Sequence, residues 1–145
     1  MEVTAIGMVE FNSIAQGIDS TDAMCKTAEV TLLVSKTVCP GKYISIVAGN
    51  VAAVEQSVRA GELKAAECVV DSFVIPNIHK ALIPAVAGTA STENVKAVGI
   101  IECFSVAVLM EAADQALKTA EVEPLQLHIA FGIGGKAYVT LTGDV

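Results

Sequence analysis

The stretch Ala5-Ile-Gly-Met-Val-Glu10 recurs as Ala97-Val-Gly-Ile-Ile-Glu102, displaced by 92 positions. At the same displacement, the run Lys-Thr-Ala-Glu-Val of residues 26–30 returns without change at residues 118–122. The match resumes after an insertion of two residues, where Gly-Lys of residues 41–42 aligns with Gly-Lys of residues 135–136. Because the period is as long as a small domain, the sequence predicts a tandem duplication of one folded unit.

Apolar runs and turn residues alternate in the first copy in an order that predicts six elements. The strands are expected at residues 3–11, 30–38, 42–47 and 69–74. Ser13 and Asn50 are suitable N-caps for two helices, of which the second is expected to end at Gly61. The order β-α-β-β-α-β is that of a ferredoxin-like unit, so the predicted fold class is α+β.

The spacing of apolar residues in each helix predicts the face that is turned toward the sheet. In the first helix the residues expected to face inward are Ile14, Ile18, Thr21, Cys25 and Ala28. In the second helix they are Val51, Val54 and Val58.

The duplication divides the chain into a first domain at residues 1–87, a polar linker at residues 88–95 and a second domain at residues 96–145. A short helix is expected at residues 79–86, before the linker. The second copy ends at the equivalent of Val51, so it is incomplete and lacks counterparts of the second helix and the last strand. The predicted architecture is therefore two tandem ferredoxin-like units, the second incomplete.

Composition excludes several classes of protein. The 145 residues are 53% hydrophobic and only 17% charged, against about 25% charged in an average domain. The apolar surplus predicts burial between subunits. No membrane span is expected, because the longest apolar run, residues 98–110, is interrupted by Glu102 and is shorter than the ~20 residues required. The net charge of −7 opposes binding of nucleic acid, and the first ten residues lack the basic start of a signal peptide.

The four cysteines do not form a single-chain metal motif. They are Cys25, Cys39, Cys68 and Cys103, and no C-x-x-C pair occurs among them. Without an export signal, disulfides are not expected. Cys25, Cys68 and Cys103 are interpreted as small core residues, whereas Cys39 stands in the turn of the first hairpin.

The glycine-rich run Gly132-Ile-Gly-Gly-Lys136 invites comparison with a phosphate-binding loop. A Walker A loop requires Gly at position 130 and Ser or Thr after the Lys, but Ala130 and Ala137 occupy these positions. The run also precedes a strand, so no helix N-terminus faces an anion. The glycines are better explained as residues that let the backbones of several chains approach one another closely around a symmetry axis.

Several segments resemble the shell domain of bacterial microcompartments (BMC). They are residues 22–28 (Asp-Ala-Met-Cys-Lys-Thr-Ala), residues 74–79 (Val-Ile-Pro-Asn-Ile-His) and the duplicated Ala-x-Gly-x-x-Glu starts. The tandem copies resemble the trimeric, double-domain shell proteins. Residues 33–42, residues 70–72 and residues 128–136 are similar to the T-type shell proteins of propanediol-utilisation microcompartments.

The resemblance implies a homotrimer that forms a flat pseudohexagonal tile in the shell of a compartment within the cytoplasm, alongside other shell proteins. It implies that the Cys39 residues of the three chains together bind one iron–sulfur cluster, expected to be 4Fe–4S, at the central pore. The implied pore-lining residues are Pro40, Gly41, Phe131, Gly132, Gly134 and Gly135. Lys26 and Lys118 match the lysine at the tile edge, but Asn77 replaces the arginine that often follows the last strand.

Two functions remain open, and neither is enzymatic. The first is a shell tile whose cluster passes electrons across the shell, with a redox protein as a possible partner. The second is a tile with an open metabolite pore and no cluster. A free-standing redox protein is a third reading, which is disfavoured because the sequence shows no substrate or nucleotide motif.

Overall fold

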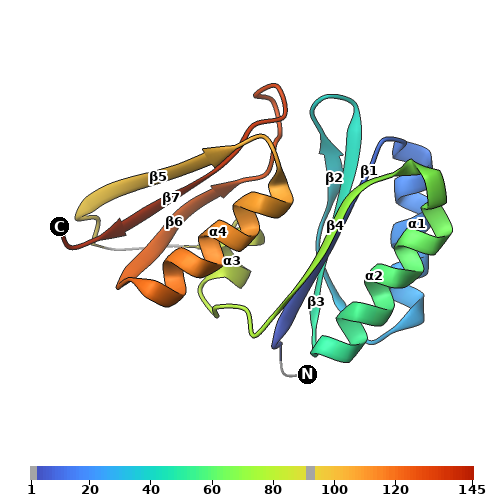
Figure 1. Ribbon diagram of the computed structural model, residues 1–145, viewed down its shortest axis with the longest axis horizontal. Coiled ribbons are helices and arrows are strands. Elements are labelled where there is room, and N and C mark those ends of the chain that lie inside the picture. The colour runs from blue at the N-terminus through green and yellow to red at the C-terminus, as the bar shows by residue number, and fades with distance from the viewer. Residues whose placement is uncertain (1–2, 91–93) are drawn as a thin grey trace. The chain divides into compact units, whose positions relative to one another are not determined.

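The computed structural model describes residues 3–90 and 94–145, which fall into two compact units, residues 1–77 and residues 78–145. Each unit contains one copy of the repeat (Figure 1). The predicted linker at residues 88–95 includes residues 91–93, which lie outside the described residues. The units are described one at a time.

The first unit has the predicted β-α-β-β-α-β order. Its elements are β1 (Ala5–Phe11), α1 (Ile14–Thr27), β2 (Thr31–Val38), β3 (Lys42–Gly49), α2 (Val51–Ala65), a 3-10 turn (Ala66–Cys68) and β4 (Val69–Pro76). The strands form one antiparallel sheet in the order β2-β3-β1-β4, with α1 and α2 on the same face (Figure 1). This is the ferredoxin-like topology, so the predicted fold class is confirmed.

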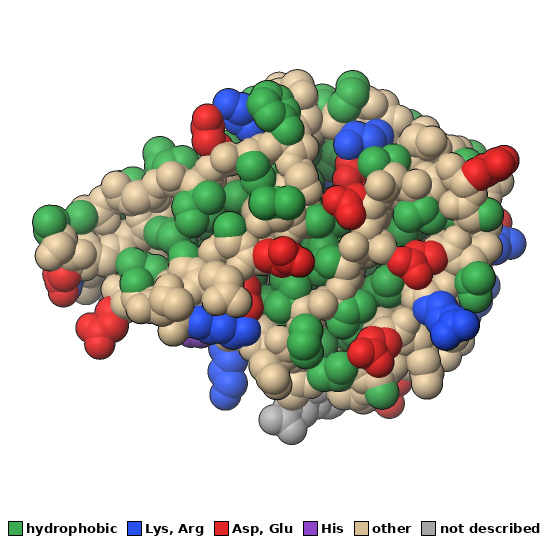
Figure 2. Space-filling view, in the orientation of Figure 1, with side chains coloured by type: hydrophobic (Ala, Val, Ile, Leu, Met, Phe, Trp, Pro, Cys, Tyr) green, Lys and Arg blue, Asp and Glu red, His purple; other side chains and the backbone are tan. Residues whose placement is uncertain are grey.

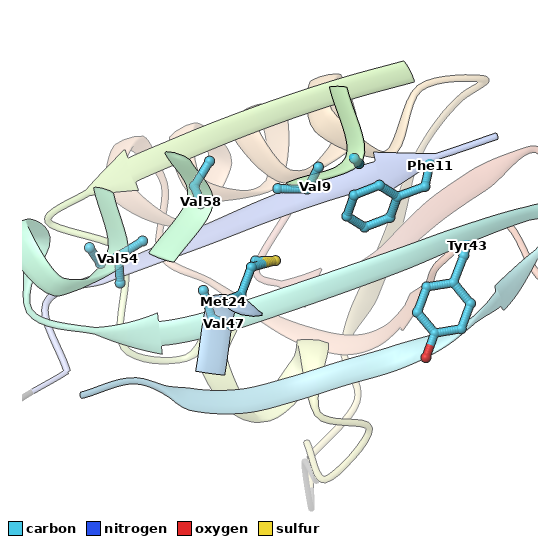
Figure 3. Packing of buried hydrophobic residues seen from close by; sticks show 9 residues of the cluster. Val9, Phe11, Met24, Tyr43, Val47, Val54 and Val58 are labelled. Carbon is cyan, nitrogen blue, oxygen red and sulfur yellow. The ribbon is translucent and has the colours of Figure 1, made fainter. Parts of the chain in front are cut away.

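The core of the first unit lies between the sheet and its two helices. Its buried side chains are Ala5, Val9, Phe11, Met24, Tyr43, Val47, Val54, Val58 and Ala65, most of which Figure 3 labels. The central strand β1 is buried along its whole length. A Cβ added to Gly7 of β1 would lie 2.5 Å from Val58 and 2.6 Å from Val54, so α2 packs directly on the backbone of this strand.

Both predicted N-caps of the first unit are confirmed. The Ser13 hydroxyl accepts a hydrogen bond from the backbone N–H of Gln16, and the Asn50 side-chain oxygen accepts one from Ala53. The predicted end of α2 at Gly61 is wrong, because the helix continues to Ala65. Gly61 is instead a contact point, where an added Cβ would lie 2.7 Å from Met24 of α1.

The predicted inward face of α1 is wrong for its largest side chains. Ile14 and Ile18 are exposed, and Cys25 is exposed as well. The buried residues of the helix are Gly17, Ser20, Thr21 and Met24. Beside Met24 the inward residues are small, and at Gly17 the helix lies so close to β3 that an added Cβ would be 2.7 Å from the ring of Tyr43.

The second unit repeats the first half of this fold. It contains α3 (Leu82–Val86), β5 (Ala97–Cys103), α4 (Val106–Thr119), β6 (Val122–His128) and β7 (Ala137–Gly143). The sheet order is β5-β7-β6, and β5 pairs with β7 in the register of β1 with β3. Ser105 caps α4 as Ser13 caps α1. Within residues 94–145 no counterpart of α2 or β4 follows β7, and β5 pairs with β7 alone.

One point on the sheet of the second unit is uncovered by the described residues. Gly99 of β5 stands at the position equivalent to Gly7, yet a Cβ added there would meet no described atom within 4 Å. The neighbouring side chains Val98 and Ile100 of β5 are also exposed.

Candidate functional site

Cys39 lies at the tip of the hairpin formed by β2 and β3, as the sequence predicts. The two strands stay in register up to the pair Val38 and Lys42, so the turn consists of Cys39, Pro40 and Gly41. The Cys39 thiol is free and half-buried, and the peptide bond to Pro40 is cis. Gly41 has a φ of 66°, a left-handed conformation that glycine adopts without strain.

Two contacts anchor the base of this hairpin. The hydroxyl groups of Ser35 on β2 and Tyr43 on β3 lie 2.6 Å apart and share a hydrogen bond. The ammonium group of Lys42, the first residue of β3, forms an ion pair with Glu10 at the end of β1. The charge of Lys42 is therefore compensated by a carboxylate.

The second copy has a longer loop at the equivalent place. Between the paired residues His128 and Tyr138 the chain turns through the glycine-rich run. The ring nitrogen Nε2 of His128 donates a hydrogen bond of 2.5 Å to the carbonyl oxygen of Phe131, and the ring stacks on Tyr138. Residues with positive φ in the loop are Ala130, Gly132, Gly134 and Gly135. The histidine thus organises the loop, a role that its isolated position in the sequence did not reveal.

The predicted pore residues fall into two sets, and each set lies in one hairpin. Cys39, Pro40 and Gly41 form the tip in the first unit, and the remaining set forms the glycine-rich loop in the second. Pro40 and Gly41 are exposed, as are Phe131, Gly132 and Gly134, whereas Gly135 is buried.

Both hairpins carry an equivalent ion pair, which the sequence analysis did not predict. Lys136 follows the glycine-rich loop as Lys42 follows the Cys39 turn, and its ammonium lies 2.9 Å from Glu102 of β5. The ammonium also lies 5.3 Å from the ring centre of Phe104. The equivalent positions of both glutamates and both lysines in the repeat were the signal for this pairing.

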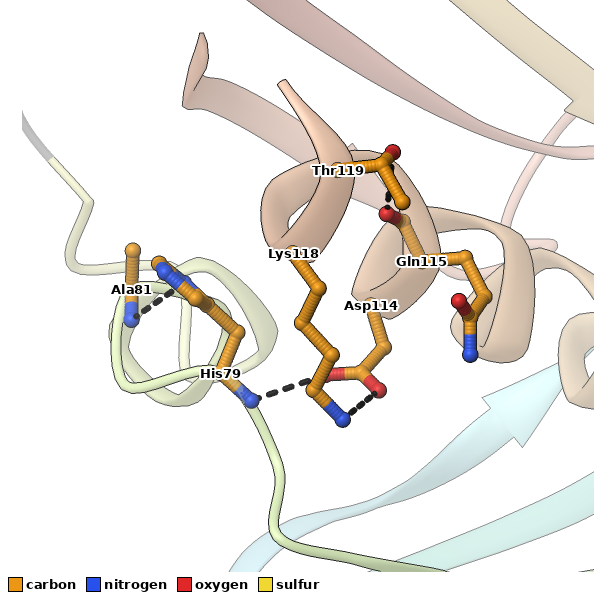
Figure 4. Close-up of polar contacts among 6 residues, drawn as sticks. All are labelled: His79, Ala81, Asp114, Gln115, Lys118 and Thr119. Carbon is orange, nitrogen blue, oxygen red and sulfur yellow. Dashed lines mark hydrogen bonds and ion pairs between the residues drawn. The ribbon is translucent and has the colours of Figure 1, made fainter. Parts of the chain in front are cut away.

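The two predicted edge lysines differ in their surroundings. The ammonium of Lys26 lies 2.6 Å from the exposed carboxylate of Asp22, and this hydrogen bond and charge raise the pKa of Lys26. Lys118 forms the same i, i+4 pair with Asp114, at 2.5 Å, but this carboxylate is only 3% exposed (Figure 4). Asp114 also accepts a 2.8 Å hydrogen bond from the backbone N–H of His79.

The remaining cysteines do not join Cys39. The predicted core position of Cys25 is wrong, because the residue is exposed. Loss of water around its partly covered thiol, together with the charge of Asp22, raises the pKa of Cys25. Cys68 packs beside the core of the first unit, and the thiol of Cys103 donates a hydrogen bond to the Ser105 carbonyl. Among the described residues no three His, Cys, Asp or Glu side chains gather as a metal site. One chain therefore offers a single free thiol at the hairpin tip.

None of the helices in the described parts of the chain is long and apolar enough to cross a membrane.

Comparison with known proteins agrees with the duplication. The family model described as the BMC domain matches residues 5–78 and residues 97–145. The bacterial microcompartment shell protein PduT of Citrobacter freundii is 49% identical over 97% of this chain and 77% of its own length. The carboxysome shell protein CsoS1C of Hydrogenovibrio crunogenus is 40% identical over 62% of this chain and 92% of its own length.

A solved structure has the same fold over nearly the whole chain. The crystal structure of a microcompartment protein from Desulfitobacterium hafniense superposes with a TM-score of 0.96 and 51% sequence identity. The match covers 99% of this chain and 80% of that protein.

Proposed function

Because the chain belongs to the BMC-domain family of microcompartment shell proteins, we propose that three copies form a pseudohexagonal tile with an iron–sulfur cluster at its centre. The chain is a structural component of a bacterial microcompartment shell within the cytoplasm, where other shell proteins are its neighbours. Its role is structural and electron-conducting instead of enzymatic. A cluster held there, one per trimer, would supply electron transfer across the shell, with a redox protein as partner.

The trimer is supported by the duplication and by apolar side chains that remain on the surface. Three chains with two similar domains each reproduce sixfold pseudosymmetry in a closed ring. Apolar groups reach the surface of the molecule (Figure 2), among them Ile18 of α1 at 54% exposure and Ile100 of β5 at 64%. Burial of such side chains between copies accounts for the apolar surplus of the sequence.

The observation that best supports the proposed cluster is the free thiol of Cys39 at the hairpin tip. A cubane cluster has a threefold axis through one iron, so three identical chains can each supply one thiolate to the other three irons. In such a trimer the three Cys39 side chains would be the protein ligands of the cluster. The donor set fits this group, because thiolates are the usual protein ligands of such clusters and each chain presents one at an accessible turn. A three-iron cluster satisfies the same symmetry.

The chain supplies the pore and the tile edge around this site. Pro40 and Gly41 leave room at the tip of the first loop, and Phe131, with its neighbouring glycines, lines the pore from the second copy. Lys26 and Lys118 contact neighbouring tiles. The cluster supplies one-electron redox chemistry, and the protein supplies its ligands and its position in the shell.

The decisive experiment is iron analysis of trimers purified without oxygen. The parent protein is expected to contain iron, sulfide and broad visible absorbance, and Cys39→Ser is expected to lose all three at unchanged trimer size. Cys103→Ser is the matched control, since Cys103 is another half-buried cysteine that the proposal leaves unligated. Iron retained in Cys39→Ser, or lost equally in Cys103→Ser, contradicts the assignment.

The alternative is a tile with an open metabolite pore. The exposed tip of the Cys39 turn, with Gly41 free of close neighbours, is compatible with a ring of unligated thiols. A parent trimer without iron, even after reconstitution with iron and sulfide, would favour this function.

A further inference from the structure

Glu10 is a buried carboxylate at the end of β1 that faces the hairpin of Cys39. Its side chain is only 5% exposed. The residues directly opposite it in the sheet are Ile44 on β3 and Asp71 on β4, and opposite residues share a face of the sheet. An apolar side chain and a second carboxylate therefore adjoin it. A charge in such a place is strongly unfavourable unless a cation is held against it.

Lys42 provides that cation, and its place in the chain links Glu10 to the Cys39 turn. Lys42 pairs in register with Val38, so these two residues are the ends of the turn. Val38 is fixed by its own burial, at 3% exposure, and Lys42 is fixed by the ion pair with Glu10. Between these two fixed ends, the tip has space on its Gly41 side.

The second copy forms the equivalent ion pair with an exposed carboxylate. Glu102 and Lys136 form the equivalent ion pair, but Glu102 is 58% exposed. In the first copy β4 pairs with β1 beside Glu10, whereas in the described part of the second copy β5 pairs with β7 alone, so the two glutamates differ in how far strands cover them. Buried ion pairs add little net stability compared with apolar replacements, and their value in specifying one geometry is a separate property.

We propose that Glu10 is a positioning residue for Cys39: by holding Lys42 in a buried ion pair, it fixes the turn that presents the thiolate to the cluster. The inference rests on the proposed function, because a fixed thiolate matters only if Cys39 binds a cluster. Three thiolates that meet on one axis must each be held near the required geometry.

The test measures the mobility of the turn without iron. A nitroxide spin label is attached to Cys39 in a protein that also carries Cys25→Ser, Cys68→Ala and Cys103→Ala, and it is diluted with a diamagnetic analogue. Electron paramagnetic resonance then compares Glu10→Gln with the matched control Glu102→Gln. Lys42→Arg is the conservative variant that keeps the ion pair.

In Glu10→Gln the spectrum is expected to lose its immobilised component, because Lys42 is free to turn toward solvent. Glu102→Gln and Lys42→Arg are expected to keep the spectrum of the parent. A label that stays immobilised in Glu10→Gln, or that loosens equally in Glu102→Gln, overturns the inference.

Iron content of the variants with all four cysteines then separates this inference from the proposed function. Glu10→Gln trimers are expected to bind several-fold less iron than the parent, while Glu102→Gln trimers bind as much. If the label loosens but the parent itself binds no iron, the proposed cluster is refuted and the fixed turn stands. If Glu10→Gln loosens the label yet binds iron as the parent does, its positioning role for the cluster is refuted.

Discussion

Alanine substitutions at Gly7 and Gly99 are predicted to have opposite effects, although these glycines occupy equivalent positions in the repeat. At Gly7 the new methyl group would lie 2.5 Å from Val58 and 2.6 Å from Val54, well short of the 3.4 Å at which ordinary contact begins. Both valines are buried, and β-branched side chains have little rotamer freedom in a helix, so α2 itself must move. Overpacking of this kind costs about 1–3 kcal/mol of unfolding free energy.

At Gly99 the methyl group meets open space, and alanine lowers the conformational entropy of the unfolded chain. Gly99→Ala is therefore expected to leave stability unchanged or to raise it by about 0.5 kcal/mol. Urea unfolding followed by circular dichroism measures the unfolding free energy of both variants. In thermal unfolding, a loss of 1 kcal/mol corresponds to a fall of about 2–4 °C in the melting temperature. If Gly99→Ala destabilises the chain as much as Gly7→Ala, the sheet face at β5 is covered and the reasoning fails.

Three further predictions concern caps, charges and assembly. Ser13→Ala is expected to lose about 1 kcal/mol in urea unfolding, because it removes the N-cap of α1, and an unchanged midpoint would contradict the cap. Asp114→Ala is expected to cost about 1–3 kcal/mol, because the partly buried N–H of His79 and the ammonium of Lys118 lose their partner, whereas the exposed Asp22→Ala stays within about 0.5 kcal/mol. Ile100→Asp is expected to shift the mass measured by light scattering from trimer to monomer with unchanged circular dichroism, and an intact trimer would show that β5 lies outside the interface.

The topology could be predicted because the repeat and the turn residues are local signals. A displacement of 92 positions established two copies, and the caps at Ser13 and Asn50 marked where the helices begin. The Cys39 turn was also recognisable, because Pro and Gly break the strand pattern between two apolar runs.

The inward face of α1 could not be predicted because packing overrides hydrophobic periodicity there. Ile14 and Ile18 gave the apolar stripe, but the helix lies so close to Tyr43 at Gly17 that the buried side there has no room for a side chain. The Glu10–Lys42 pair was missed for a related reason: residues far apart in the sequence meet only after β1 and β3 are aligned.

The differences between the copies place the proposed function in the loops instead of the framework. The caps, the Glu–Lys pairs and the strand register are the same in both copies, and these features form the backbone of each unit. The turn sequences differ, with Cys39 in one copy and a longer glycine-rich loop in the other. In a pseudohexagonal trimer, a cysteine in both loops would place six thiols around the axis, whereas a cubane with threefold symmetry takes three. In the proposed trimer, loss of the sixfold equivalence would match the number of thiolate ligands to the cluster, and the duplication would allow one loop to change while the other keeps the ring closed.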